Sequence, residues 1–273
     1  MNVVSTMPPR GSADRAFVPT MGALHEGHRT LMRKARQQVG SHGEVVVSVF
    51  VNPTQFGANE DFDEYPRSLD ADAQACAEEG VDFVYAPSVH DVYGGHATIT
   101  VDPGPLGFEL EGRTRPGHFA GVLTVVSILL HQVDPAVAMF GEKDYQQLVL
   151  VRRMCADLSF PVRIVGVKTV RDVDGLARSS RNVFLSDDER RRALAIPRAL
   201  HAGAAAARDG AEQAQAAAVA ELDSAGLSID YVEVRDPDLG LPPRNGEARL
   251  LIAVQVGSTR LIDNCRIEVG NDR

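Results

Sequence analysis

The chain has 273 residues, an apolar content of 44% and a formal net charge of −9. That apolar content argues against a disordered chain, and the negative charge disfavours a nucleic-acid surface without opposing nucleotide binding. The three cysteines, Cys76, Cys155 and Cys265, are unclustered, which is typical of free thiols in a reducing cytosol rather than of a disulfide framework.

Strand and helix patterns alternate over the first 170 residues. The expected strands are residues 16–21, 44–51, 81–87, 136–141 and 161–170. The expected helices follow Leu31, Ala35 and Val39 at helical spacing, and cover 70–80, 117–133 and 145–158. This alternation predicts right-handed βαβ units and a parallel sheet.

The pattern changes after about residue 172. Residues 187–225 are rich in Ala, Arg, Asp and Glu and predict helices, whereas 229–234 and 248–256 predict strands before the closing segment RLIDNCRIEV. We therefore expect an α/β chain with a Rossmann-like parallel sheet in residues 1–171 and a smaller α+β domain in 172–273. With no apolar leader at the N-terminus and no run long enough to span a bilayer, we expect a soluble, cytoplasmic protein without a membrane partner.

Residues 17–28 read FVPTMGALHEGH, a strand that breaks at Gly22 and leads into a helix near Gly27 or His28. The free N–H groups and the dipole at such a helix start attract phosphate, and His25 and His28 can add donors. A zinc site is disfavoured, because the two histidines are spaced i, i+3 and no cysteine lies nearby. Two purely structural histidines remain an alternative.

Three further polar segments follow expected strands or lie in the loop after one. Asn52 and Gln55 in FVNPTQF could recognise a small polar substrate or simply line a loop. Lys143 and Asp144 in FGEKDYQQ could stabilise a phosphoryl group and bind a ribose, or form a surface ion pair. Residues 179–181 in DGLARSSRNVFLS could fold over a triphosphate or serve as a hydrophilic connector. The GxGxxG and P-loop motifs are absent, which disfavours a common dehydrogenase or P-loop kinase.

Taken in order, these stretches resemble the pantothenate synthetase family, within the HIGH-type nucleotidyltransferase superfamily. The resemblance covers nearly the whole chain, from about Phe17 to Ile267, and rests on six stretches: PTMGALHEGH, FVNPTQF, EDFDEYPR, RPGHFAGV, FGEKDYQQL and DGLARSSRN. Residues 178–182 match the position of the superfamily's second signature.

The resemblance implies ATP-dependent condensation of pantoate with β-alanine through a pantoyl adenylate, releasing pyrophosphate and AMP. The implied catalytic residues are His25, His28, Lys143, Ser179, Ser180 and Arg181. The implied ATP-binding residues are Met21, His28, Gly141, Lys143, Asp144, Val170, Ser179, Ser180 and Arg181. The implied pantoate and β-alanine residues are Asn52, Gln55, Arg115, His118 and Gln147, with His118 alternatively structural.

The resemblance also implies Mg²⁺ beside the ATP, with Asp72, Asp70 and Gln74 as candidate ligands and surface positions on a helix as the alternative. It implies a homodimer, and a C-terminal domain that closes as a lid to protect the adenylate from water. Arg178 departs from the family, which usually has an apolar residue there, and we expect its side chain to face solvent or the triphosphate.

Two other functions remain open from the sequence. A nucleotidyltransferase related to phosphopantetheine adenylyltransferase would stop at nucleotide transfer, but such chains are shorter and lack NPTQF and the second domain. A catalytically silent binding protein is disfavoured by the intact His25, His28, Lys143 and Arg181.

Overall fold

The computed structural model describes residues 1–57, 68–95 and 98–270. The chain forms two compact units: an N-terminal unit of residues 1–142 and 146–168, and a C-terminal unit of residues 143–145 and 169–273. We expected the division after residue 171. The structure divides the chain after Lys168 and groups residues 143–145 with the later unit. The EDFDEYPR stretch lies outside the described residues.

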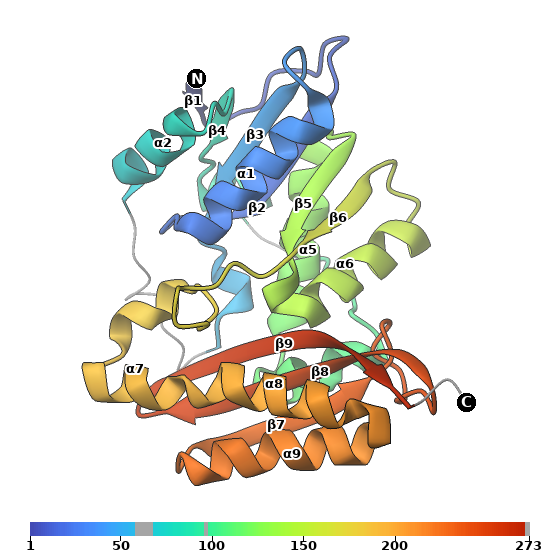
Figure 1. Ribbon diagram of the computed structural model, residues 1–273. Helices are drawn as coiled ribbons and strands as arrows, with labels where there is room; N and C mark the ends of the chain where they lie inside the picture. Colours follow the sequence, from blue (N-terminus) through green and yellow to red (C-terminus); the bar gives the residue numbers. More distant parts are fainter. Residues whose placement is uncertain (58–67, 96–97, 271–273) are drawn as a thin grey trace. The chain divides into compact units, whose positions relative to one another are not determined.

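The N-terminal unit is built on a six-stranded sheet in which every pairing is parallel (Figure 1). Its order is β1-β4-β3-β2-β5-β6. The strands are β1 Asn2–Val4, β2 Arg15–Thr20, β3 Glu44–Val49, β4 Phe83–Tyr85, β5 Val137–Gly141 and β6 Arg163–Val167. Because β2 continues to β3 on one side and pairs with β5 on the other, the strand order reverses between β2 and β5. Ligands of open parallel sheets bind beyond the carboxyl ends of the strands at such a reversal.

The helices of this unit include the four expected from sequence. They are α1 Glu26–Val39, α2 Leu69–Glu78, α3 Val89–Tyr93, α4 Glu111–Thr114, α5 His118–Val133 and α6 Tyr145–Asp157, of which Tyr145 belongs to the C-terminal unit. Helix α5 is buried along most of its length, as its apolar sequence predicts. Among the described residues, no helix is both long and apolar enough to cross a bilayer.

The core of the N-terminal unit explains the continuous apolar strands. Val45, Val46 and Val47 of β3 are all at most 1% exposed, so both faces of this strand are covered. Met32 and Ala35 of α1 pack into the same core as β2, β3 and β5. A parallel sheet buried in this way fixes the loops that leave its strand ends.

The C-terminal unit is an antiparallel sheet with helices packed along it (Figure 1). Its strands are β7 Ser228–Arg235, β8 Gly246–Val256 and β9 Thr259–Val269, and its helices are α7 Asp187–Ala193, α8 Ala195–Ala206 and α9 Ala211–Ser224. Alanines and Gly203 allow close packing, since a Cβ on Gly203 would lie 2.4 Å from Leu250 Cδ2. The α/β fold class and the smaller α+β domain are confirmed.

Sequence patterns missed the shortest elements. Strand β1 pairs with β4 at the sheet edge, and helices α3 and α4 have only five and four residues. Elements this short give too few positions for a hydrophobic period to stand out, and tertiary pairing decides them. The expected strand 161–170 is shortened to Arg163–Val167.

Candidate functional site

The loop after β2 turns sharply at Gly22. Gly22 has φ +84°, and a Cβ there would lie 2.7 Å from Asp72 Oδ2 and 3.1 Å from Val49 Cγ1. Both the backbone conformation and the space therefore require glycine. The turn directs the chain from β2 into α1 and brings residues 21–25 to the carboxyl end of the sheet.

His25 and His28 form the start of α1, one residue earlier than expected. His25 is the N-cap: its Nδ1 accepts a hydrogen bond from Gly27 N at 3.1 Å, and His28 Nδ1 accepts one from His25 N at 3.2 Å. Because each Nδ1 is an acceptor, the proton of each neutral ring is on Nε2. The two rings lie 4.1 Å apart between centroids. Both histidines are half-buried rather than part of the apolar core, and each offers an Nε2–H donor at the positive end of a helix.

Asp72 has a role that the sequence did not suggest. Its carboxylate accepts hydrogen bonds from Ala23 N at 3.1 Å and Leu24 N at 2.9 Å, and the residue is 4% exposed. Burial raises the pKa of Asp72, and the bonds from Leu24 and Ala23 oppose that shift. Asp72 thus holds the turn that precedes His25.

The other candidate metal residues lie on the same helix. Asp70 is exposed, and Gln74 donates to Glu78 at 3.2 Å. Within the described parts of the chain, no three His, Cys, Asp or Glu side chains are grouped as a metal site would require. The structure therefore gives Asp72 a loop-holding contact, and its metal-binding role stays a prediction.

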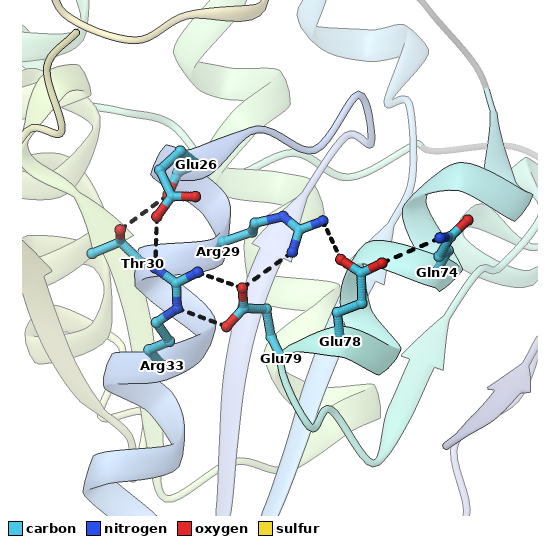
Figure 2. Close-up of polar contacts among 7 residues, drawn as sticks. All are labelled: Glu26, Arg29, Thr30, Arg33, Gln74, Glu78 and Glu79. Carbon is cyan, nitrogen blue, oxygen red and sulfur yellow. Dashed lines mark hydrogen bonds and ion pairs between the residues drawn. The ribbon is translucent and has the colours of Figure 1, made fainter. Parts of the chain in front are cut away.

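Helix α2 is fixed against α1 by a network of charged side chains (Figure 2). Arg29 bonds Glu78 at 2.7 Å and Glu79 at 3.2 Å, while Arg33 Nε bonds Glu79 at 2.7 Å. Arg33 also reaches Glu26 in the first turn of α1 at 2.6 Å. This network sets the position of α2 and, through it, of Asp72.

The NPTQF segment after β3 forms a closed set of amide contacts. Asn52 is 1% exposed; its Oδ1 accepts from Tyr93 Oη at 2.6 Å, and its Nδ2 donates to Gln55 Oε1 at 3.1 Å and Gly121 O at 3.2 Å. These bonds make Asn52 a support for the loop. Gln55 Nε2 points at Met21 Sδ, 2.9 Å away. A thioether is a weak acceptor, so this amide donor would gain by turning to a ligand oxygen.

Arg115 and His118 meet this segment at the start of α5. Arg115 Nη1 lies 3.0 Å from His118 Nε2, and His118 Nδ1 lies 2.9 Å from Gln55 O. Guanidinium only donates and a carbonyl only accepts, so both bonds require a neutral imidazole with its proton on Nδ1. His118 is 9% exposed and therefore links Arg115 to Gln55, as the structural alternative anticipated.

Gly141 is the last residue of β5, and Gln147 lies in the following helix α6. Apart from Gly141 and its two chain neighbours, no described atom lies within 4 Å of where a Cβ on Gly141 would stand, so packing against the rest of the described chain does not explain this glycine. Gln147 is half-buried, whereas its neighbour Gln146 is 3% exposed and bonds Glu111 N, Leu106 O and Glu109 O. Gln146 is a structural amide that sequence could not distinguish from Gln147.

The remaining predicted residues belong to the C-terminal unit. Lys143 Nζ lies 3.6 Å from Asp144 Oδ1, and Asn264 Nδ2 donates to Lys143 O at 2.9 Å. Ser179 caps the short helix Ser180–Phe184 by accepting from Arg181 N at 3.2 Å. Lys143 and Ser179 line one small open pocket in this unit, with Leu176, Asn182, Ile196 and Asp263 among its other walls.

Residues 170–178 form a turn that ends just before Ser179. Val170 O accepts from Arg178 N at 2.9 Å, which closes the turn. The Arg178 side chain is 42% exposed and its Nε lies 2.7 Å from Asp172 Oδ1, while Arg190 bonds both Asp172 and Asp174. The Arg178 side chain is thus partly exposed to solvent, as we expected, and it also has an ion-pair partner in its own turn.

The fold and the site define a class of protein: an α/β protein with a histidine pair at the start of the helix after its first long strand. The family model described as pantoate–β-alanine ligase matches residues 3–266. The pantothenate synthetase of Saccharopolyspora erythraea is 58% identical over 256 residues, which cover 93% of this chain and 84% of that protein. The one of Mycolicibacterium smegmatis is 57% identical, covering 93% and 81%.

Solved structures agree with these sequence matches. The pantothenate synthetase of Thermus thermophilus superposes with a TM-score of 0.91 at 45% identity, covering 97% of this chain and 99% of that one. The pantoate–β-alanine ligase of Francisella tularensis, complexed with "Beta-gamma ATP" and β-alanine, has a TM-score of 0.81 at 33% identity, covering 97% of each chain. The chain belongs to the pantoate–β-alanine ligase family, and it is a ligase.

Proposed function

We propose that this enzyme joins pantoate to β-alanine with ATP through a pantoyl adenylate, releasing pyrophosphate and AMP. Family membership supports the substrates, and the ligands of the Francisella tularensis complex support ATP and β-alanine. The observation that carries the mechanism is the placement of the His25 and His28 imidazoles at the start of α1, where each Nδ1 accepts a backbone hydrogen bond.

In the first step, a pantoate carboxylate oxygen attacks the α-phosphorus and pyrophosphate leaves. Such a transfer depends mostly on positioning and charge stabilisation, because little covalent chemistry is left to the protein. His25 and His28 would donate to phosphate oxygens, while Lys143 and Arg181 supply positive charge. Ser179 and Ser180 would add hydroxyl donors.

In the second step, the β-alanine amine attacks the activated acyl carbon and AMP leaves. The new C–N bond replaces the acyl–phosphate C–O bond, and the amine releases a proton. The family resemblance gives the pantoate hydroxyls and carboxylate to Gln55 and Gln147 and places Arg115 and His118 at the substrate side. The Gln55 amide facing Met21 Sδ supports a donor role there. Asn52 would act indirectly by holding Gln55.

For the nucleotide, the resemblance assigns the ribose to Asp144 and nearby contacts to Met21, Gly141 and Val170. The open space at the Gly141 Cβ position supports a close approach of ligand to backbone. We keep the lid role of residues 172–273 as a proposal, since the adenylate must be protected from water.

Mg²⁺ would accompany ATP and neutralise charge on its phosphates. The donor set on α2 does not by itself make a metal cage, because the Asp72 oxygens already accept two backbone bonds and Gln74 donates to Glu78. Asp70, an exposed carboxylate, is the remaining candidate ligand beside phosphate and water oxygens. No catalytic step is assigned to the ion.

The deciding experiment measures two releases separately. We expect pyrophosphate release to require pantoate, and AMP release to require β-alanine as well. Pyrophosphate release without pantoate, or with phosphopantetheine in its place, would instead favour a nucleotidyltransferase. Sedimentation velocity tests the proposed homodimer, and fractionation tests the proposed cytoplasmic location.

A further inference from the structure

Strand β9 carries two neighbouring polar residues that are almost completely buried. Asp263 is 2% exposed and Asn264 is 5% exposed, between the buried Leu261 and Ile267 of the same strand. Burying a carboxylate and an amide in a sheet costs free energy unless their partners compensate. The partners of Asp263 and Asn264 therefore explain why polar residues occupy these buried positions.

Asp263 holds the base of the turn that leads to Ser179. Its two oxygens accept from Arg171 at 2.6 and 3.0 Å, a paired arrangement that is stronger than a single charged bond. Burial alone would lower the pKa of Arg171, but the hydrogen bonds and charge of Asp263 outweigh it and raise that pKa. The backbone of Arg171 forms an antiparallel β-bridge with Ala177, and its side chain donates to Gly175 O at 3.0 Å. Arg171 therefore fixes both arms of the turn.

Asn264 holds the backbone of Lys143. Its Nδ2 donates to Lys143 O at 2.9 Å. Two residues later, Tyr145 is 7% exposed, its hydroxyl donates to Pro237 O at 3.0 Å, and Arg249 lies 3.7 Å above its ring. Residues 143–145 are thus anchored to the β7–β9 sheet, which explains why they group with the C-terminal unit.

The two anchors converge on one pocket. Lys143, Ser179 and Asp263 all line it, within the C-terminal unit. A carboxylate and an amide, adjacent in sequence, each hold one of the two segments that carry the proposed phosphate-binding groups.

We propose that Asp263 and Asn264 are positioning residues, which hold Lys143 and the Ser179–Arg181 segment at a fixed spacing for adenylate formation. This inference rests on the proposed function for what the two segments bind. A misplacement of about 1 Å can cost roughly 100-fold in rate, so even a small relaxation at this strand would be measurable.

The test uses Asn264→Leu, which keeps the branching at Cγ but removes the donor to Lys143 O, and Arg171→Lys, which keeps the charge but loses the paired bonds. We expect kcat for pantoate-dependent pyrophosphate release to fall about 10- to 100-fold in each. Release of AMP from supplied pantoyl adenylate and β-alanine should fall less. Ile267→Ala, a buried apolar change in the same strand, is the matched control and should lower the Tm without changing the ratio of the two rates.

A purely structural role would make Asn264→Leu behave like Ile267→Ala, with both half-reactions reduced equally, and that result would overturn the proposal. Amide hydrogen exchange gives a second readout that needs no activity. We expect residues 142–147 to exchange faster in Asn264→Leu than in Ile267→Ala, and equal exchange would also overturn the proposal. If the unaltered enzyme released no pyrophosphate with pantoate, the proposed function would fail while the exchange comparison still tested the anchoring.

Discussion

Each histidine at the start of α1 has two nitrogens with separate tasks. Nδ1 completes the helix start, and Nε2–H is the atom that we propose as a donor to phosphate. The i, i+3 spacing that argues against zinc is the spacing of a capping box. The structural alternative for these residues and the functional one are therefore compatible, because they involve different atoms.

Substitution of His25 can separate the capping role of Nδ1 from the proposed donor role of Nε2. His25→Asn keeps an N-cap acceptor but removes the imidazole Nε2–H, so we expect less than about 0.5 kcal/mol of lost stability. Pantoate-dependent kcat should fall about 100- to 1,000-fold, the usual cost of one lost transition-state donor. Chemical denaturation and pyrophosphate release measure the two effects.

The control is His25→Ala, which removes the cap as well and should cost about 1 kcal/mol of stability. Near-normal kcat in His25→Asn would mean that the imidazole is only a cap.

At Asp72, substitution distinguishes the loop contact from the metal role. Asp72→Asn places an amide NH₂ against one of the N–H donors of Ala23 and Leu24, so we expect about 1–3 kcal/mol of lost stability and lower activity. Excess Mg²⁺ should not restore that activity. Restoration by Mg²⁺, with unchanged stability, would return Asp72 to the metal site. Asp70→Asn, at the remaining candidate ligand on the same helix, is the comparison for stability alone, which it should leave unchanged.

At the scale of elements, several of the predicted site residues follow strand ends, and helices hold those segments in position. Helix α2 contributes Asp72 to the turn before His25, and the network of Figure 2 fixes α2 on α1. Sequence predicted both helices, but it could not show that α2 supports the start of α1. That support depends on Arg29 and Arg33 meeting Glu78 and Glu79, which lie 46 or more positions away in the chain.

This network has a predictable pH dependence. Hydrogen bonds from Arg33 hold the pKa of Glu79 below its usual range, and partial burial opposes them. Because the folded-state pKa is lowered, the contribution of Glu79 is present above its unfolded pKa of about 4.3 and is lost as the pH falls through the folded value. We expect Glu79→Gln to lose about 0.5–1 kcal/mol of stability at neutral pH and progressively less below about pH 4.3.

The measurement is chemical denaturation of the unaltered protein and of Glu79→Gln from neutral pH to below about pH 4.3. Glu247→Gln, which removes a more exposed pair with Arg266, should change stability little at any pH. A loss in Glu79→Gln that stays constant down to low pH would contradict the electrostatic explanation.

At the scale of the whole molecule, the chain builds two separate cores. Met139 and Val47 belong to the core of the N-terminal unit, and Leu250 and Ile252 to that of the C-terminal unit. Lys143, the first residue of the C-terminal unit in the chain, lies in the turn that follows β5, and its carbonyl oxygen accepts a hydrogen bond from Asn264 of β9. The turn before Ser179 carries the fully exposed Val173, and Val183 and Phe184 beside it are also exposed.

Ligands that bind residues 179–181 should therefore protect this exposed segment. We expect ATP with pantoate to slow proteolytic cleavage within residues 172–186, because bound groups reduce local opening. Mass spectrometry of timed digests makes the measurement, with the exposed Leu241 loop as the internal control. Identical cleavage of 172–186 with and without ligands would contradict the proposed lid.

The sequence by itself determined the alternation of strands and helices, the change to a smaller α+β unit and the segments that we propose to carry the chemistry. It could do so because buried strands, helix periods and glycine turns are local patterns. Only the tertiary structure decided that Asn52 and His118 support Gln55, that Asp72 holds the turn before His25, and that Asp263 and Asn264 anchor the later segments. Those roles depend on bonds between residues distant in the chain, and no local pattern encodes which buried polar groups will meet.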